Sequence, residues 1–579
     1  MKKYNSLIIS GFAGLLFACA LHLSAQPNAS QLNINNIDAR INSHGGLFWD
    51  LTGNKGFEVP AGSGRHSIYA STLWIGGFDP SGQLTLSGET YGVSGPDFMA
   101  GPICDPAHYQ SNAVLWDRVW RITRNEIDLH RANYGQPGYV APADLLSWPG
   151  NGDVSKGEAA ILAPFRDVNG DGIYQPMSGD YPIIRGDLAI YSIFNDAAVA
   201  NPGTGGQPLS VEVHQMAYAF DCNDPAEANT IYLNYRLINR SATNYTDTYL
   251  GMWTDFDVGG PQDDYVGCDV GRGAYFAYNG DDFDENSTGS LGYLDYPPVQ
   301  GVMVLGGPMR DMDGTDNSVA TSEPGSVNGI GYGDGITDNE RLGMSNFMYY
   351  TNAPLFDPST AADFYNYLRS IWPNGQLLTH GDNGSLGSNL PTQYAFPGNS
   401  NPDGHGHFGI VQPAWTMGGE GLLGNDVRGL GSCGPFTFEA GSEEEFDLAF
   451  VYARDPQQTG ALAALPLFES YLDDVKANYA MRQSACGTAL ATSIIAVEPT
   501  LAGVEVFPNP SRGWVTVDRS ESPSPLQYEL VDATGRTVKQ GTVSGTSQQL
   551  DFSQFSAGWY LIRFQTEESF QSMPLLLQP

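Results

Sequence analysis

Short runs of alternating apolar and polar residues recur along most of the chain, separated by clusters of Gly, Asn, Asp and Pro. This alternation is typical of antiparallel strands that bury one face. In residues 230–240 every second side chain, starting with an isoleucine, is Ile, Leu or Tyr, and residues 248–258 and 444–455 alternate in the same way. The sequence therefore predicts strands at these three places, the first of them half-buried.

One segment has a different period. Residues 464–481 place Leu465, Phe468, Leu472 and Val475 at helical spacing, which predicts a helix with one apolar face. We therefore expect a mainly β fold: a large antiparallel β-sandwich-type body with few helices, on which this helix packs.

Changes in composition divide the chain into five parts. Lys2 and Lys3 precede an apolar run and small residues, which predicts a cleaved secretory signal peptide; a lipoprotein signal ending at Cys19 is the alternative. The expected parts are a signal peptide (1–25), an N-terminal β-rich region with an acidic loop (26–205), a central β-sandwich region ending in the helix (206–486), a linker (487–503) and a C-terminal unit (504–579).

Charge and cysteine content limit which partners and metal sites the chain can have. With 64 acidic and 27 basic residues the formal net charge is -37, which repels nucleic acids and anionic lipids and attracts divalent cations. After the signal peptide no apolar run reaches the length of a membrane span. The mature chain keeps five cysteines, without a CxxC spacing: Cys104, Cys222, Cys268, Cys433 and Cys486. Up to two disulfides are expected, and a thiolate metal site is not.

The C-terminal unit contains three segments of alternating apolar and polar residues separated by turns, which predicts a small immunoglobulin-like sandwich. Three short motifs follow one another within it: Phe-Pro-Asn-Pro with a following Gly, then Gly-Arg, then Gly-x-Tyr. Their residues are Pro508, Asn509, Pro510, Gly513, Gly535, Gly558 and Tyr560.

In this order the motifs resemble the type A C-terminal sorting domain of type 9 secretion cargo in the Bacteroidota. The resemblance implies periplasmic transit and display at, or release from, the outer cell surface. It also implies two partners, the secretion translocon and a sortase. The last residues, SFQSMPLLLQP, depart from such tails because they lack a lysine.

The body is similar to an uncharacterised family of secreted Bacteroidota proteins that carry the same tail. The similarity rests on segments such as GGLFWD (45–50), STLWIGG (71–77), GDGITDNERLGM (333–344) and CGPFTF (433–438). It implies no mechanism.

An acidic loop at residues 167–180 has oxygen-bearing side chains at alternate positions followed at once by Gly172, as in the first half of an EF-hand loop. Ser178 stands where an EF-hand has its bidentate Glu. The predicted Ca²⁺ ligands are Asp167, Asn169, Asp171, the Ile173 carbonyl and Asp180. The alternative is a hydrogen-bonded Asx turn without a metal. Either role is structural.

A second acidic group follows residues 248–258. Asp255 and Asp257 share a strand face, and Asp263 and Asp264 come soon after. So many carboxylates repel one another unless a cation offsets them, so a second Ca²⁺ site is expected. A solvated loop is one alternative. Inverting glycoside hydrolysis is another, since side chains two residues apart on a strand lie about 6.5–7 Å apart.

Residues 403–407 (DGHGH) offer two imidazoles, which we interpret as an exposed turn. No GxSxG, HExxH or GK[ST] motif occurs. We expect a secreted, surface-displayed, calcium-stabilised β-protein with a binding or structural role, whose exposed aromatics bind glycans or matrix polymers. A polysaccharide-degrading hydrolase with paired carboxylates is the alternative.

Overall fold

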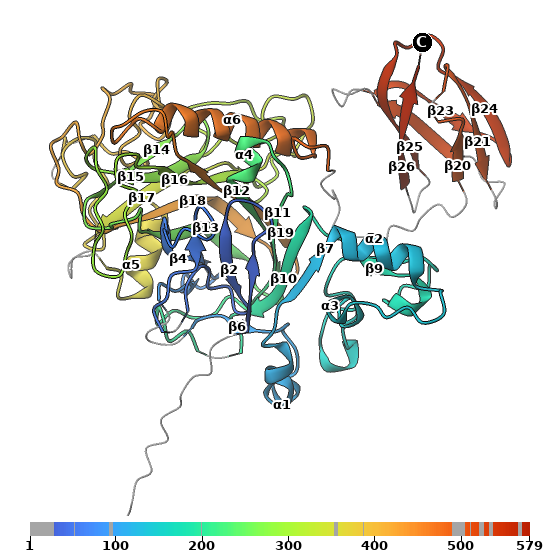
Figure 1. Ribbon diagram of the computed structural model, residues 1–579, viewed down its shortest axis with the longest axis horizontal. Helices are drawn as coiled ribbons and strands as arrows, with labels where there is room; N and C mark the ends of the chain where they lie inside the picture. Colours follow the sequence, from blue (N-terminus) through green and yellow to red (C-terminus); the bar gives the residue numbers. More distant parts are fainter. Residues whose placement is uncertain are drawn as a thin grey trace, which may run out of the picture.

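The computed structural model describes residues 28–578 except 51, 92–95, 199, 352–356, 386, 389, 489–503, 510, 520–525, 532–536 and 566–569. The expected signal peptide (1–25) and most of the expected linker lie outside the described residues. The predicted fold class is confirmed: the body is built from antiparallel sheets with few helices (Figure 1). None of the described helices combines the length and the apolarity needed to cross a membrane.

Two large sheets form the body. The nine-stranded sheet runs in the order β14 (Asp264–Asp269), β15 (Ala274–Asn279), β16 (Val299–Gly306), β19 (Glu443–Ala453), β12 (Thr230–Asn239), β11 (Val211–Ala219), β10 (Leu188–Asn195) and β6 (Met99–Ala100), with β7 (Trp120–Thr123) also paired to β10. The five-stranded sheet runs β17 (Asn346–Thr351), β18 (Val427–Phe438), β13 (Tyr245–Phe256), β4 (Ile68–Phe78) and β5 (Leu84–Ser87).

Two small sheets complete the body. They consist of β1 (Ala29–Leu32), β2 (Asp38–Asn42) and β3 (Phe57–Glu58), and of β8 (Phe165–Arg166) with β9 (Tyr181–Pro182). Both large sheets contain strands from regions 26–205 and 206–486, and the two sets pair directly: β10 with β11 in the larger sheet and β4 with β13 in the smaller. The two regions therefore share one core.

That core lies between the two large sheets. Trp74 of β4 stacks on Trp253 of β13 at 6.1 Å between ring centroids, and both belong to one buried cluster with Tyr235 of β12 and Phe450 of β19. A second buried cluster covers the opposite face of the nine-stranded sheet. The strand at residues 230–240 is confirmed, but its predicted half-burial is wrong, because Tyr232 and Asn234 on its other face are 3% and 1% exposed under that second cluster.

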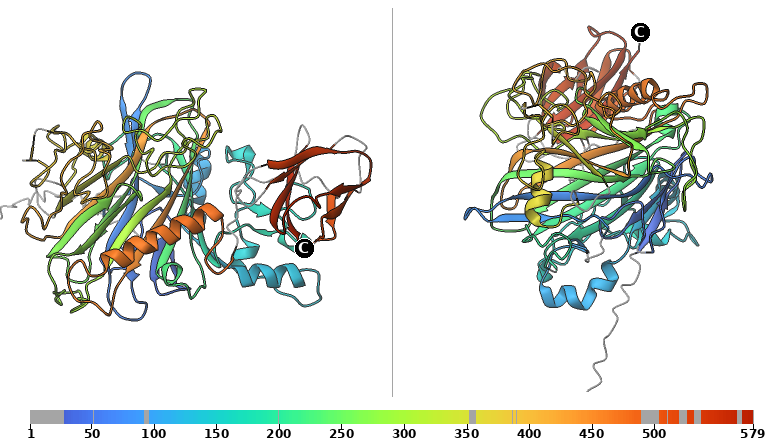
Figure 2. Two further views of the ribbon diagram at one scale, coloured as in Figure 1. Left: turned by 90° about the horizontal axis from the view of Figure 1, so that it is seen from above. Right: turned by 90° about the vertical axis from the view of Figure 1, so that its left-hand side faces the viewer.

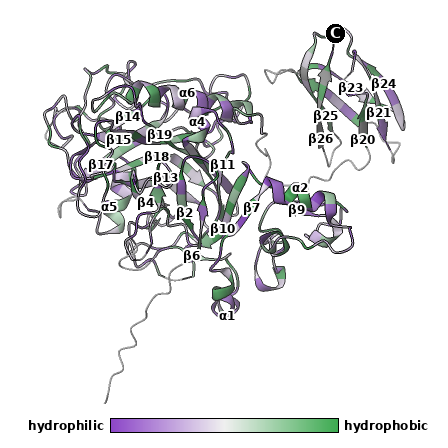
Figure 3. Cartoon of the chain, in the orientation of Figure 1, coloured by the Kyte–Doolittle hydropathy of each residue, from purple (hydrophilic) through white to green (hydrophobic). Residues whose placement is uncertain are grey.

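The predicted C-terminal helix is confirmed as α6 (Leu465–Met481), which runs across the nine-stranded sheet (Figure 2). Phe468, Leu472 and Val475 are buried against that sheet. Hydrophilic and hydrophobic residues both occur along the helix (Figure 3). The shorter helices are α1 (Pro106–Trp116), α2 (Arg124–Asn133), α3 (Ala143–Leu146), α4 (Pro225–Ala228) and α5 (Ala361–Leu368), with 3₁₀ turns at Val154–Lys156 and Pro176–Ser178.

A disulfide joins Cys222, just after β11, to Cys486, just after α6. It links residues 264 positions apart. Cys104, Cys268 and Cys433 are free thiols. This disulfide fastens the last helix of the body to the sheet that it covers.

The C-terminal unit is a small sandwich, as predicted. One sheet has the order β20 (Val504–Phe507), β21 (Trp514–Arg519) and β24 (Ser547–Asp551), and the other β23 (Thr537–Val543), β22 (Leu526–Val531), β25 (Gly558–Gln565) and β26 (Phe570–Leu577). Val515 and Val517 of the first sheet share a buried cluster with Leu530, Ile562 and Phe564 of the second. This unit thus has a core of its own.

Candidate functional site

An open cavity of ≈ 520 Å³ lies at the end of β13, and we call it the acid–aromatic cavity. Its lining residues are Trp49, Thr52, Gly53, Tyr69, Tyr91, Asp255, Asp257, Pro261, Asp357, Asp426 and Arg428. The sheet positions its centre, because Asp255 of β13 pairs in register with Arg428 of β18. Directly opposed residues in antiparallel strands point to the same side, so this carboxylate and guanidinium meet.

Arg428 organises the charges of the cavity. Its Nε lies 3.1 Å from Asp255 Oδ1, and its Nη1 lies 2.7 Å from Asp426 Oδ1. The hydroxyl of Tyr91 donates to Asp255 Oδ2 at 2.8 Å and accepts from Arg428 Nη2 at 2.8 Å. Arg428, Tyr91 and the two carboxylates therefore form one continuous polar network.

Asp257 joins this network from the edge of the cavity. One oxygen each of Asp255, Asp257 and Asp426 lie within 4.8 Å of one another. Lys55 forms an ion pair with Asp257. Three clustered carboxylates thus face two cationic side chains, and Asp357 adds a fourth carboxylate to the cavity wall.

Burial shifts the protonation of these acids. Burial raises the pKa of Asp255 well above its usual range, although the charge of Arg428 opposes the shift. Burial raises the pKa of Asp257 to about 6, against the opposing charge of Lys55. Asp257 therefore changes charge near neutral pH, which makes it suited to exchanging a proton with a bound molecule.

Aromatic rings form the other wall. Tyr91 makes edge contacts with Trp49 at 6.4 Å, with Tyr69 at 5.9 Å and with Trp253 at 5.3 Å between centroids. Trp49 comes from the chain between β2 and β3, and Tyr69 from β4. Rings and carboxylates from distant segments thus surround one cavity, the usual composition of a small-molecule site.

The structure distributes the four acids of the expected second Ca²⁺ site over different places. Asp255 and Asp257 lie together, and Asp426 completes their group of three carboxylates. Asp263 is grouped instead with Asp281 and Glu285. Asp264 is fully buried and accepts the Val258 N–H at 2.9 Å. The separation arises because the chain leaves the five-stranded sheet after β13 and enters the nine-stranded sheet at β14.

The loop at residues 167–180 is closed by its own carboxylates. Asp167 accepts the Gly170 and Gly172 N–H groups, both at 2.7 Å, and Asp171 accepts the Ile173 N–H at 2.9 Å. Gly172 has φ +74°, the left-handed conformation that a sharp turn needs. The side-chain amide of Asn169 donates to Asp171 at 2.8 Å.

Asp180 supports this loop from inside. It is fully buried, and its two oxygens accept the Val168 N–H at 2.8 Å and the Gln175 N–H at 2.7 Å. Each loop carboxylate oxygen keeps a further lone pair. The arrangement is compatible both with a metal-free Asx turn and with a bound Ca²⁺.

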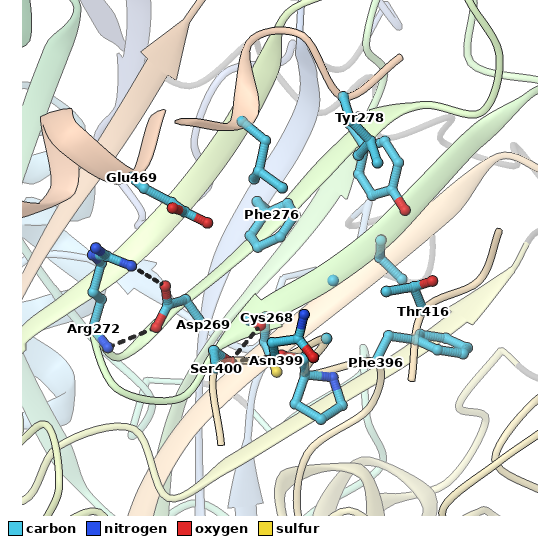
Figure 4. Close-up of a pocket in the computed structure, with 16 residues that line it drawn as sticks. Cys268, Asp269, Arg272, Phe276, Tyr278, Phe396, Asn399, Ser400, Thr416 and Glu469 are labelled. Atoms are coloured by element: carbon cyan, nitrogen blue, oxygen red, sulfur yellow. Dashed lines mark hydrogen bonds and ion pairs between the residues drawn. The ribbon is translucent and has the colours of Figure 1, made fainter. Parts of the chain in front are cut away.

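A further cavity of ≈ 460 Å³ lies beside β14 and β15 (Figure 4). Arg272 donates to both carboxylate oxygens of Asp269, from its backbone N–H at 2.9 Å and from Nη1 at 2.7 Å. The Cys268 thiol donates to the Ala395 carbonyl, and burial raises its pKa well above its usual range. Arg272 therefore neutralises Asp269, and the Cys268 thiol stays protonated and unreactive. Neither group is suited to catalysis.

The described residues of the predicted sorting motifs lie at turns or in the first residues of β25 in the C-terminal unit. At Gly513, φ is +100° and an added Cβ would lie 2.5 Å from Ser553, so only glycine fits. The Tyr560 hydroxyl donates to the Ser556 carbonyl at 3.0 Å. Pro508 and Asn509 follow β20, and Gly558 opens β25. Pro510 and Gly535 lie outside the described residues.

Residues 505–577 match the family model of the secretion system C-terminal sorting domain. The chain is therefore cargo of the type 9 secretion system, as its tail motifs predicted, and it is exported to the outer cell surface or beyond. No curated protein matches the chain.

Among solved structures, one that this chain matches is titled as a polysaccharide lyase. The TM-score is 0.18 at 9% identity, over 63% of this chain. The match spans only 34% of the lyase chain. Similarity at this level carries no argument about function.

Sequence reasoning identified Asp255 and Asp257 but missed their partners. Lys55, Tyr91 and Arg428 lie more than a hundred residues away from them in the chain, and none belongs to a recognisable motif. The only sequence feature that pointed to the cavity was the density of acids after residue 254.

Proposed function

We propose that this exported protein binds glycans or matrix polymers at the cell surface, and that the acid–aromatic cavity is its binding site. The observation that carries the proposal is the meeting of Trp49, Tyr69 and Tyr91 with a carboxylate cluster around one open cavity. Aromatic faces suit the C–H faces of sugar rings, and carboxylates accept hydrogen bonds from hydroxyl groups.

Arg428 and Lys55 offset much of the acid charge in the cavity. Because burial raises the pKa of Asp255 and of Asp257, the four carboxyl groups of Asp255, Asp257, Asp357 and Asp426 are not all ionised at neutral pH, and the cavity carries little net charge. Neutral saccharides with many hydroxyl groups fit such a cavity.

The test is a glycan array with the labelled secreted chain, followed by calorimetry with the best ligand. Tyr69→Ala should weaken that ligand by about tenfold or more, a loss of about 1.4 kcal/mol. Phe283→Ala is the matched control, because Phe283 is a partly exposed ring outside the cavity. Equal affinity of Tyr69→Ala and wild type would contradict the proposal.

Hydrolysis is the second candidate, favoured by one observation. Asp257 has a pKa raised by burial to about 6 and lies beside Asp255. Oxygens within 4.8 Å are closer than inverting glycosidases require, about 6.5–9.5 Å, and nearer to the retaining arrangement. Release of reducing ends by the wild type, lost in Asp257→Asn, would establish an enzyme; binding without release would leave the binding role alone.

We also propose that Ca²⁺ stabilises the body. The first site is the loop of Asp167, Asn169, Asp171, Ile173 and Asp180, whose oxygens are grouped around one turn. For the second, Asp255 and Asp257 would bind Ca²⁺ only in competition with Arg428 and Lys55. A fall of one in Ca²⁺ stoichiometry in Asp257→Asn supports that second site, and unchanged stoichiometry removes it.

After export, we propose that a sortase removes the tail and attaches the body to the cell surface. The match to the sorting domain supports this step. Mass spectrometry of the surface protein should find a new C-terminus before residue 504.

A further inference from the structure

A third cavity, of ≈ 550 Å³, lies next to the end of α5 and shares no lining residue with the acid–aromatic cavity. We call it the Phe408 cavity. The lining residues used in the argument are Glu323, Arg369, Gln393, His405 and Phe408.

Phe408 projects from a strained turn. Its φ is +56° and its side chain is 81% exposed. A bulky residue seldom adopts this conformation, and such strain gathers at binding sites. The turn is fixed by N–H bonds from His407 and Gly409 to the Gly404 carbonyl, at 3.1 and 3.0 Å. The backbone therefore holds an apolar ring outward at the edge of the cavity.

The neighbouring imidazole of His405 lines the cavity. The sequence interpretation of residues 403–407 as an exposed turn is wrong for both histidines, because His405 and His407 are 7% and 3% exposed. Asn401 binds the backbone of His405 on both sides, at 2.7 and 2.8 Å. The His405 ring, however, has no hydrogen-bond partner among the described residues, although it lines the cavity.

Burial lowers the pKa of His405, so at neutral pH its ring is uncharged and offers one donor and one acceptor. A ligand in the cavity can therefore bond to this ring through either nitrogen.

Arg369 supplies the charge of the cavity. Its guanidinium stacks over the Tyr365 ring at 4.2 Å and donates from Nη2 to Asn366 at 2.9 Å. Among the described residues no carboxylate forms an ion pair with it. Glu323, the acid on the same wall, is engaged by Arg310 at 3.2 Å. Arg369 is therefore pre-oriented and available to an anionic group.

We propose that the Phe408 cavity binds an oligosaccharide unit that carries a single carboxylate. The sugar ring lies on Phe408, the carboxylate pairs with Arg369, and hydroxyl groups bond to His405 and Gln393. The net charge of -37 repels long polyanions, so an isolated acidic sugar on a neutral chain fits better than a polyuronate. This site is independent of the acid–aromatic cavity.

The test uses calorimetry on the full secreted chain with pairs of probes. Each pair is a neutral xylo-oligosaccharide and the same molecule with one glucuronic acid branch. The branched probe should bind at least about tenfold more tightly. Arg369→Gln should abolish this preference, and Phe408→Gly should weaken both probes. The ratio of the two affinities is the readout that separates this site from the proposed function: it should persist in Tyr69→Ala, whatever that variant does to glycan binding at the acid–aromatic cavity.

Two matched controls should bind like wild type: Arg482→Gln, an exposed arginine after α6, and Val114→Ala, which is 88% exposed on α1. If Arg369→Gln fails to fold, Arg369→Lys is the second variant. It keeps the positive charge but loses the planar guanidinium that can bind a carboxylate through two hydrogen bonds, so it should show a reduced preference. Equal binding of both probes to the wild type would overturn the proposal. So would displacement of the sugar by a short peptide through its C-terminal carboxylate.

Discussion

Lys55 and Asp257 form an ion pair that is almost removed from solvent: their side chains are 13% and 8% exposed, and Lys55 Nζ lies 2.5 Å from Asp257 Oδ2. Even with this cation beside it, burial raises the pKa of Asp257 to about 6. The desolvation of the carboxylate therefore outweighs its attraction to Lys55.

This balance predicts how stability depends on pH. The folded pKa of Asp257, about 6, exceeds the unfolded value of about 3.9, so the folded state binds the proton more tightly. The contribution of Asp257 is fully present below pH about 4 and is lost as pH rises to about 6, by about 2–3 kcal/mol. Urea denaturation across this range should show that loss in the wild type and a flatter dependence in Asp257→Asn. The exposed control Asp128→Asn should behave as wild type; a flatter curve there too would refute the assignment.

Breaking the Cys222–Cys486 disulfide should destabilise the body. A cross-link over a loop of 264 residues restricts the unfolded chain, and disulfides typically contribute about 2–4 kcal/mol. Cys222→Ser with Cys486→Ser should lower the free energy of unfolding by about 3 kcal/mol. Cys104→Ser, which removes a free thiol, is the control and should have a much smaller effect.

Calcium should raise the melting temperature of the body by binding only its native state. The double variant Asp167→Ala with Asp171→Ala should lose this increment, and chelator should abolish it in the wild type. The control is Asp79→Ala, since Asp79 closes a similar exposed turn by accepting the Ser81 and Gln83 N–H groups. Calorimetric scans that coincide with and without calcium would favour the metal-free Asx turn.

Removing residues 504–579 should leave a folded body in the periplasm. The sorting domain has its own buried cluster, so we expect the body's unfolding free energy to change little. Fractionation with an antibody to the body measures the outcome. Surface display of the truncated chain at normal levels would show that the tail is not required for export.

The sequence predicted strands best where the alternation was long. Residues 248–258 and 444–455 became β13 and β19, and the helical spacing of Leu465 to Val475 became α6. The predicted burial was wrong where both faces of a strand are covered, as at Tyr232, because an alternating pattern indicates only one apolar face. Two of the four predicted acids line the cavity, because Asp255 lies near the end of β13 and Asp257 directly follows that strand.

The remaining parts of the candidate site could not be predicted, because they depend on which strands become neighbours. Arg428 reaches Asp255 only through the pairing of β18 with β13. The disulfide is a similar case: five mature cysteines allow many pairings, and only the packing of α6 on the sheet selects Cys222 with Cys486.

The position of Cys486 also sets an order of events in biogenesis. The ribosome makes Cys222 first, then most of both sheets, then Cys486, and only afterwards the sorting domain at residues 505–577. A nascent chain therefore contains both cysteines before its sorting domain has been synthesised. A body that is cross-linked before its sorting domain is recognised can leave the periplasm only with its 264-residue loop closed, not as an extended single strand.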